Sequence, residues 1–166
     1  MSRRFLCAAV SGAILLIVPA VAAAHETATK ITVWGKSVRF EAIDQNGGGM
    51  GMGDLYAGSY VLSSTRGGAQ VGTADWASTV VRENMPGATD YRATQWRVLL
   101  RGGSLLVNGI FQADSGTQAH SPRTQTLYVT GGAGKYFGAR GTATSTTLNK
   151  TERKWVFQII GADPQS

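Results

Sequence analysis

The chain has 166 residues and a formal net charge of +6, from 16 Lys and Arg against 10 Asp and Glu. Its basic residues are scattered singly along the chain, which is typical of a solvated surface and argues against nucleic acid as a partner. The single cysteine lies near the start, at Cys7, so the rest of the chain forms no internal disulfide and holds no thiol nucleophile.

The first residues have the three parts of a secretory signal peptide. A pair of arginines makes a positive start, residues 5–21 form an apolar run, and Ala22-Ala23-Ala24 supplies the small residues that signal peptidase requires. We expect cleavage after Ala24, which assigns residues 1–24 to the signal peptide and 25–166 to one domain. An uncleaved membrane anchor is the alternative. The cleaved protein would have no stable membrane span and would be secreted or lie in the periplasm or cell envelope.

Eight short runs rich in Val, Ile, Thr and aromatic residues follow, separated by turns of Gly, Asn and Pro. No stretch of ten or more residues has helical periodicity. The predicted strands are 31–43, 54–64, 70–83, 90–101, 104–114, 124–130, 138–148 and 153–161. Eight strands joined in sequence within one small domain predict an all-β fold, an eight-stranded antiparallel barrel that closes to remove its edges. A two-sheet sandwich is the alternative.

Alternation within the early strands separates two faces. Tyr56, Gly58 and Tyr60 share one face of strand 54–64, and Trp76 and Ser78 share one face of strand 70–83. Glycines among large aromatic residues leave space inside a tapering barrel. A solid aromatic core is the alternative, and a cavity above roughly 300 Å³ would favour ligand binding.

A glycine-rich segment late in the chain, Gly131–Gly141, joins a Gly-Gly-Ala-Gly turn to an aromatic pair and Ala-Arg-Gly. A Thr-rich strand follows where a phosphate-binding loop would need a helix. The segment resembles the late signature of dirigent proteins.

A second set of motifs resembles those of plant allene oxide cyclases and falls in the same order. The motifs are Gly53-Asp54-Leu55, Val71-Gly72, residues 91–94 and residues 103–109. The resemblance covers most of residues 38–161. It implies an eight-stranded antiparallel barrel with a hydrophobic cavity, often assembled as a trimer.

The resemblance to allene oxide cyclases also implies site residues. Glu41, which follows an aromatic residue on the first strand, matches the family's catalytic carboxylate. Tyr91 and Phe111 match two aromatic wall positions, whereas Ile43 and Tyr60 replace the asparagines that hold a water molecule. With the inward aromatic positions, the implied cavity residues are Tyr56, Tyr60, Trp76, Ser78, Tyr91, Arg97, Phe111 and Arg140.

Strand 90–101 carries two patterns that disagree. The family alignment points Arg97 inward, whereas hydrophobicity points Trp96, Val98 and Leu100 inward. A barrel whose outer face packs against sister subunits accommodates both patterns, so we expect a homo-oligomer, a trimer or a dimer.

An inward Arg97 requires a carboxylate, and Glu41 is the partner we expect. Arg140 is a rival partner for Glu41. In the alternative interpretation Arg97 faces solvent.

The sequence predicts no metal site and no cofactor, because the two histidines, His25 and His120, lack metal-ligand spacing and no Ser-His-Asp setting is recognisable. The predicted function is binding of a small hydrophobic or aromatic molecule. The barrel would steer its cyclisation or coupling, with Glu41 as charge stabiliser or base. The alternative is a non-catalytic secreted or envelope barrel with a binding or structural role. Whether the chain is a cofactor-independent cyclase or isomerase, and which ligand it takes, stay open.

Overall fold

The computed structural model describes residues 28–48, 51–83, 89–114 and 122–161. The predicted signal peptide and both histidines lie outside the described residues. Within the described part of the chain, no helix has the length and apolar character needed to cross a lipid bilayer.

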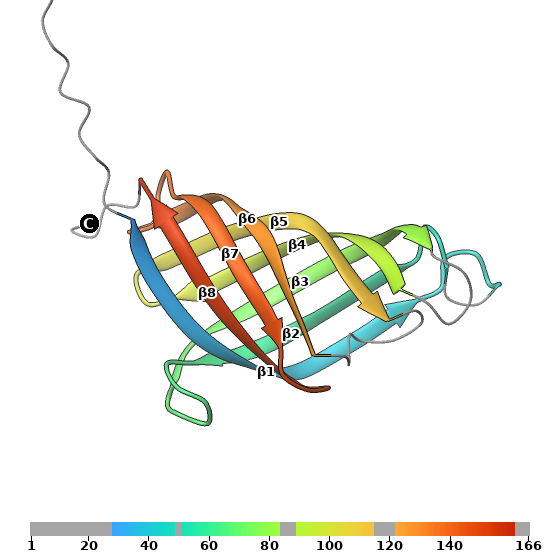
Figure 1. Cartoon of the computed structure of the whole chain (residues 1–166), viewed down its shortest axis with the longest axis horizontal. Helices are drawn as coiled ribbons and strands as arrows, with labels where there is room; N and C mark the ends of the chain where they lie inside the picture. Colours follow the sequence, from blue (N-terminus) through green and yellow to red (C-terminus); the bar gives the residue numbers. More distant parts are fainter. Residues whose placement is uncertain (1–27, 49–50, 84–88, 115–121, 162–166) are drawn as a thin grey trace, which may run out of the picture.

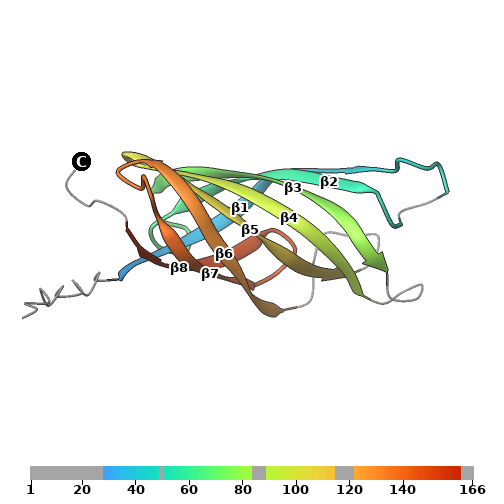
Figure 2. The ribbon, with the colours of Figure 1, turned by 90° about the horizontal axis from the view of Figure 1, so that it is seen from above.

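Eight antiparallel strands form a single closed barrel, as Figures 1 and 2 show. Each strand pairs with the next along the chain, and the first pairs with the last, Ile31 lying opposite Phe157. The strands are β1 (Thr29–Ile43), β2 (Leu55–Ser63), β3 (Gln70–Glu83), β4 (Thr89–Leu100), β5 (Gly103–Asp114), β6 (Arg123–Gly134), β7 (Arg140–Thr147) and β8 (Glu152–Ile160). The predicted eight-stranded antiparallel barrel is confirmed, and the two-sheet sandwich is wrong.

Strict alternation of buried and partly buried residues defines the inner face of the barrel, most regularly along β2 and β8. The interior packs mainly aliphatic and aromatic side chains into one cluster of buried residues. These are Val33, Tyr60, Leu62, Ala74, Trp96, Val98, Leu105, Val107, Leu127, Val129, Tyr136, Ala139, Ala143, Trp155, Phe157 and Ile159. Much of the barrel is therefore a solid core.

The Gly-Asp-Leu motif ties the loop after β1 to the barrel end. Asp54 is fully buried and accepts hydrogen bonds from the backbone amides of Gln45, at 2.8 Å, and Gly51. Gly53 donates its amide to the carbonyl of Val80 on β3 at 2.9 Å. The motif thus has a structural role, because a buried carboxylate is stable when backbone amides satisfy it.

The glycine-rich segment differs from its prediction. Gly131–Gly134 is the last part of β6 and pairs with β5, and the reverse turn lies at residues 135–138. A side chain at Gly132 would collide with the carbonyl oxygens of Tyr136 and Ser104. The glycines therefore allow the turn to fold closely onto the strand pair, a contact that sequence spacing does not reveal.

Candidate functional site

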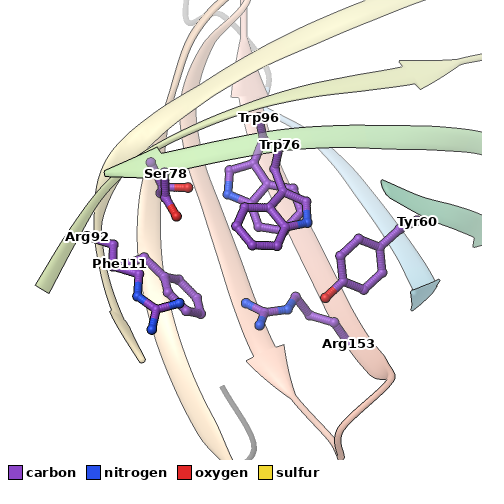
Figure 3. Close-up of a pocket in the computed structure, with 8 residues that line it drawn as sticks. Tyr60, Trp76, Ser78, Arg92, Trp96, Phe111 and Arg153 are labelled. Atoms are coloured by element: carbon purple, nitrogen blue, oxygen red, sulfur yellow. The ribbon is translucent and has the colours of Figure 1, made fainter. Parts of the chain in front are cut away.

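An enclosed cavity lies inside the barrel, between side chains from β2, β3, β4, β5 and β8 (Figure 3). Its lining residues are Tyr60, Trp76, Ser78, Arg92, Thr94, Trp96, Phe111 and Arg153. The cavity volume is about 20 Å³, which is room for about one water molecule. It does not reach the roughly 300 Å³ that would by itself favour a ligand.

Stacked indole rings form one wall of this cavity. The Trp76 and Trp96 ring centroids lie 5.4 Å apart at an interplanar angle of 27°. Trp96 also contacts Tyr60 at 5.7 Å and meets Trp155 edge to face at 4.3 Å. Gly58 makes the arrangement possible, because a Cβ there would lie 2.7 Å from the Trp76 indole nitrogen. The predicted use of glycine among inward aromatics holds at this position.

Arg92 enters the cavity from β4 with its charge compensated. Its side chain is buried, and Nη2 lies 3.1 Å from a carboxylate oxygen of buried Asp90. The same nitrogen donates to the Asp114 carbonyl at 3.2 Å. The guanidinium carbon lies 3.6 Å above the centre of the Tyr56 ring. Arg92 thus has an ion pair, a backbone acceptor and an aromatic face.

Arg153 enters from β8, and its hydrogen-bond partners among the described residues are neutral. It is 3% exposed, and Nη1 donates to the Ser145 hydroxyl at 3.0 Å. Burial lowers the pKa of Arg153, and its interaction and hydrogen bond with Tyr60 partly oppose that shift. Its guanidinium carbon lies 4.6 Å above Phe111 and 5.7 Å above Trp96. None of the ion pairs among the described residues includes Arg153.

Several buried polar atoms on the cavity lining have no hydrogen-bond partner within the described part of the chain. They are Trp76 Nε1, Ser78 Oγ, Arg92 Nε, Trp96 Nε1 and Arg153 Nε. All except the hydroxyl are donors only, and the hydroxyl can also donate. The cavity therefore presents an excess of donors together with one uncompensated positive charge.

Five of the predicted site residues do lie inside the barrel. Tyr60, Trp76, Ser78 and Phe111 line the cavity, and Tyr56 is fully buried beneath Arg92. Alternation along β2 and β3 placed four of these residues, and the resemblance to allene oxide cyclases placed the fifth, Phe111.

Glu41 does not lie inside, which corrects the predicted placement of the catalytic residue. It is exposed and pairs with exposed Arg39 at 2.5 Å on the outer face. The cause is a β-bulge at Val38, where the pairing of β1 with β2 shifts by one residue. The bulge turns Phe40 inward, opposite Gly58, and every second residue from Glu41 outward.

Three further predicted residues also lie outside the cavity. Tyr91 is on the outer face, where the Arg82 guanidinium covers its ring at 3.9 Å. Arg97 is exposed on the outer face of β4, opposite Asp75, as the alternative interpretation had it. Arg140 is exposed at the first residue of β7, at the opposite end of β8 from Arg153. In β4 the hydrophobic pattern was right, and the family alignment was wrong.

The same pattern removes the argument for an oligomer. Trp96 and Val98 belong to the core of a single barrel, and Leu100 packs against that core. The predicted trimer or dimer stays a prediction without support from these side chains.

The predicted cavity residues did not include Arg92, Thr94, Trp96 or Arg153, although hydrophobicity had pointed Trp96 inward. The alternation of buried residues could have placed both arginines. Arg92 lies four residues from Trp96 along β4, and Arg153 lies two residues from Trp155 along β8, so each points to the same face as that tryptophan. An arginine at a core-facing position of a regular strand is the pattern to look for.

Two larger hollows, of about 470 and 520 Å³, lie on the outside of the barrel. One lies between Trp34 and the exposed Arg66–Glu152 ion pair, and the other spans the outer face of β3, β4 and β5. Both are open to solvent, so they desolvate a ligand less than the internal cavity would.

No family model matches the chain, and no curated protein matches its sequence. The resemblance to allene oxide cyclases in particular stays an expectation from the motifs.

Solved structures do resemble this barrel. Pyocyanin demethylase superposes with a TM-score of 0.64 at 21% identity, over 79% of this chain and 99% of its own. The pterocarpan synthase dirigent protein GePTS1 gives 0.59 at 14% identity, over 81% and 88% of the two chains. The Diels–Alderase AbmU from Streptomyces koyangensis gives 0.58 at 12% identity, over 82% and 68%. At these identities the likeness shows only that the chain shares the overall fold of these proteins.

Proposed function

We propose that this barrel binds a small aromatic or hydrophobic molecule in the internal cavity and steers its cyclisation or coupling without a cofactor. The observation that carries the proposal is the burial of two arginines, Arg92 and Arg153, in the core of a small domain. Buried charges cost stability, and a core of apolar residues would serve a purely structural barrel better. Polar groups kept in such a place are typical of a functional site.

The lining suits reactions of an unstable aromatic intermediate. Trp76, Trp96 and Phe111 offer flat apolar surfaces that would orient a planar molecule and exclude water. The guanidinium groups would stabilise negative charge that develops on an oxygen atom. The predicted role of Glu41 as base is not retained, because its carboxylate lies on the outer face. The proteins of similar fold include a Diels–Alderase and a dirigent protein, which is in keeping with such a role.

One observation favours the non-catalytic alternative, in which the barrel has a binding or structural role only. The cavity of about 20 Å³ admits no organic molecule until lining side chains move. A ligand stacked on Phe111 requires the side chain of Arg153 to move, because its guanidinium covers that face of the ring.

Ligand binding can be tested with the protein's own tryptophans, of which Trp76 and Trp96 line the cavity. Trp34 lies on the outside, next to Lys154, so Trp34→Phe leaves mainly the interior signal. We expect planar aromatic compounds to quench that fluorescence and to raise the melting temperature. At 100 times Kd, a ligand adds about 2.7 kcal/mol of stability. A panel in which no compound changes either signal would refute the proposal.

Steering can be tested on any compound that binds. Its coupling or cyclisation should give an excess of one stereoisomer, and Ser78→Ala should reduce that excess. Ser59→Ala is the matched control, because Ser59 lies opposite exposed Asp75 on the outer face. A racemic product in the presence of bound protein would favour the non-catalytic alternative.

A further inference from the structure

We propose that the ligand of the internal cavity is a planar aromatic molecule with one anionic oxygen group, a carboxylate or a phenolate, and that Arg153 is its anchor. The inference rests on the proposed function, namely that the cavity takes an aromatic molecule. It adds the charge of that molecule and the residue that binds the charged group.

The two buried arginines differ in whether a carboxylate compensates their charge. Arg92 has a counter-charge, since Asp90 lies 3.1 Å away on the same strand. Arg153 is hydrogen-bonded only to hydroxyl groups, Ser145 at 3.0 Å and Tyr60, and no ion pair among the described residues includes it. A guanidinium stays protonated in proteins, so it cannot relieve its burial by losing a proton. Arg153 is thus a fixed positive charge in the interior with a free Nε donor.

The other unpartnered atoms select for the same kind of group. The indole nitrogens of Trp76 and Trp96 can only donate, and the Ser78 hydroxyl can donate as well. An oxygen anion accepts several such hydrogen bonds, and a carboxylate fits the two-pronged guanidinium. A cationic ligand would add a second positive charge beside Arg153, and no ion pair among the described residues offsets the charge of Arg153.

The aromatic part of the ligand follows from the position of Arg153. Its guanidinium lies over Phe111 at 4.6 Å, a cation–π contact that supplies no negative charge. A flat ring can replace the guanidinium on that face, while the guanidinium moves to the ring's edge to bind the anionic group. The exchange keeps Phe111 covered and gives Arg153 the counter-charge that the resting site lacks.

Matched probes separate charge from shape. We would titrate 2-naphthoate and its neutral isostere 2-naphthamide into the purified protein at pH 7 by calorimetry. We expect naphthoate to bind at least tenfold more tightly. In Arg153→Met, the Kd for naphthoate should rise at least tenfold, and the ratio of the naphthamide Kd to the naphthoate Kd should fall to about one. In Arg153→Lys, which keeps the charge and loses the fork, part of the preference should remain.

Arg97→Met is the control, because Arg97 is an exposed arginine on the outer face of the same barrel. It should keep the wild-type preference. The melting temperature of Arg153→Met should be no lower than that of wild type, since the change removes an uncompensated buried charge. A lower value would overturn the assignment of Arg153 as uncompensated.

The outcomes distinguish this inference from the proposed function. Equal binding of naphthoate and naphthamide, or a preference that survives in Arg153→Met, overturns the anion inference and leaves the aromatic site standing. Failure of both probes, together with every neutral compound in the fluorescence panel, overturns the proposed function itself.

Discussion

Replacing Asp90 by Asn tests the buried ion pair that holds one side of the cavity. The change keeps the shape of the side chain and one acceptor oxygen but removes the charge 3.1 Å from Arg92. Arg92 would keep the Asp114 carbonyl and the Tyr56 ring, neither of which carries a compensating charge. Breaking a buried pair by removing one partner costs about 3–5 kcal/mol. A domain of this size has about 5–15 kcal/mol in total, so a large share of its stability should be lost.

Urea denaturation measures the loss, and the chain supplies a matched control. Arg39 and Glu41 are also two residues apart on one strand, but their side chains are 68% and 48% exposed. Glu41→Gln should therefore change the free energy of unfolding by less than about 1 kcal/mol. The double variant Asp90→Asn/Arg92→Met should recover part of the loss, because it leaves no unpaired charge. If Asp90→Asn costs no more than Glu41→Gln, the account of a buried pair at the cavity is wrong.

Three other predictions concern the barrel, its surface and its leader. Gly58→Ala places a methyl group 2.7 Å from an indole nitrogen and should cost about 1–3 kcal/mol in urea denaturation, whereas Gly48→Ala, with open space around it, should be close to neutral. Hydrogen bonds from Arg66 and, to a smaller extent, Asn149 hold the pKa of Glu152 in the folded protein below its ordinary value of 4.5. The Arg66–Glu152 pair therefore stabilises the fold above pH 4.5, and this stabilisation is lost as pH falls through the lower folded pKa. Glu152→Gln should thus lower the melting temperature slightly at pH 7, and the difference from wild type should shrink as pH falls below 4.5. N-terminal sequencing of exported protein should start at or near His25, and recovery of the full-length chain in membranes would contradict the signal peptide.

The order of the strands and the approximate bounds of most of them could be predicted from the sequence, because they depend on local patterns; the C-terminal part of β6 is the exception. Alternation of buried and exposed residues and glycine-rich turns act over a few residues, so the predicted strand 70–83 coincides with β3. The inward positions of Tyr60, Trp76 and Ser78 followed from the same period of two. Hydrophobicity also placed Trp96 correctly, against the family alignment.

Tertiary structure decided which polar residues the barrel encloses. The bulge at Val38 shifts the register by one residue and so sends Glu41 to the solvent, and one-residue shifts have no clear mark in sequence. The meeting of Arg92 from β4 with Arg153 from β8 depends on closing the barrel, because the two lie on strands that do not pair with each other. The two arginines also differ in charge compensation, which depends on tertiary distances. Asp90 lies 3.1 Å from Arg92, whereas no ion pair among the described residues includes Arg153. Local patterns specify which face a residue takes, whereas closure of the sheet determines which inward side chains meet.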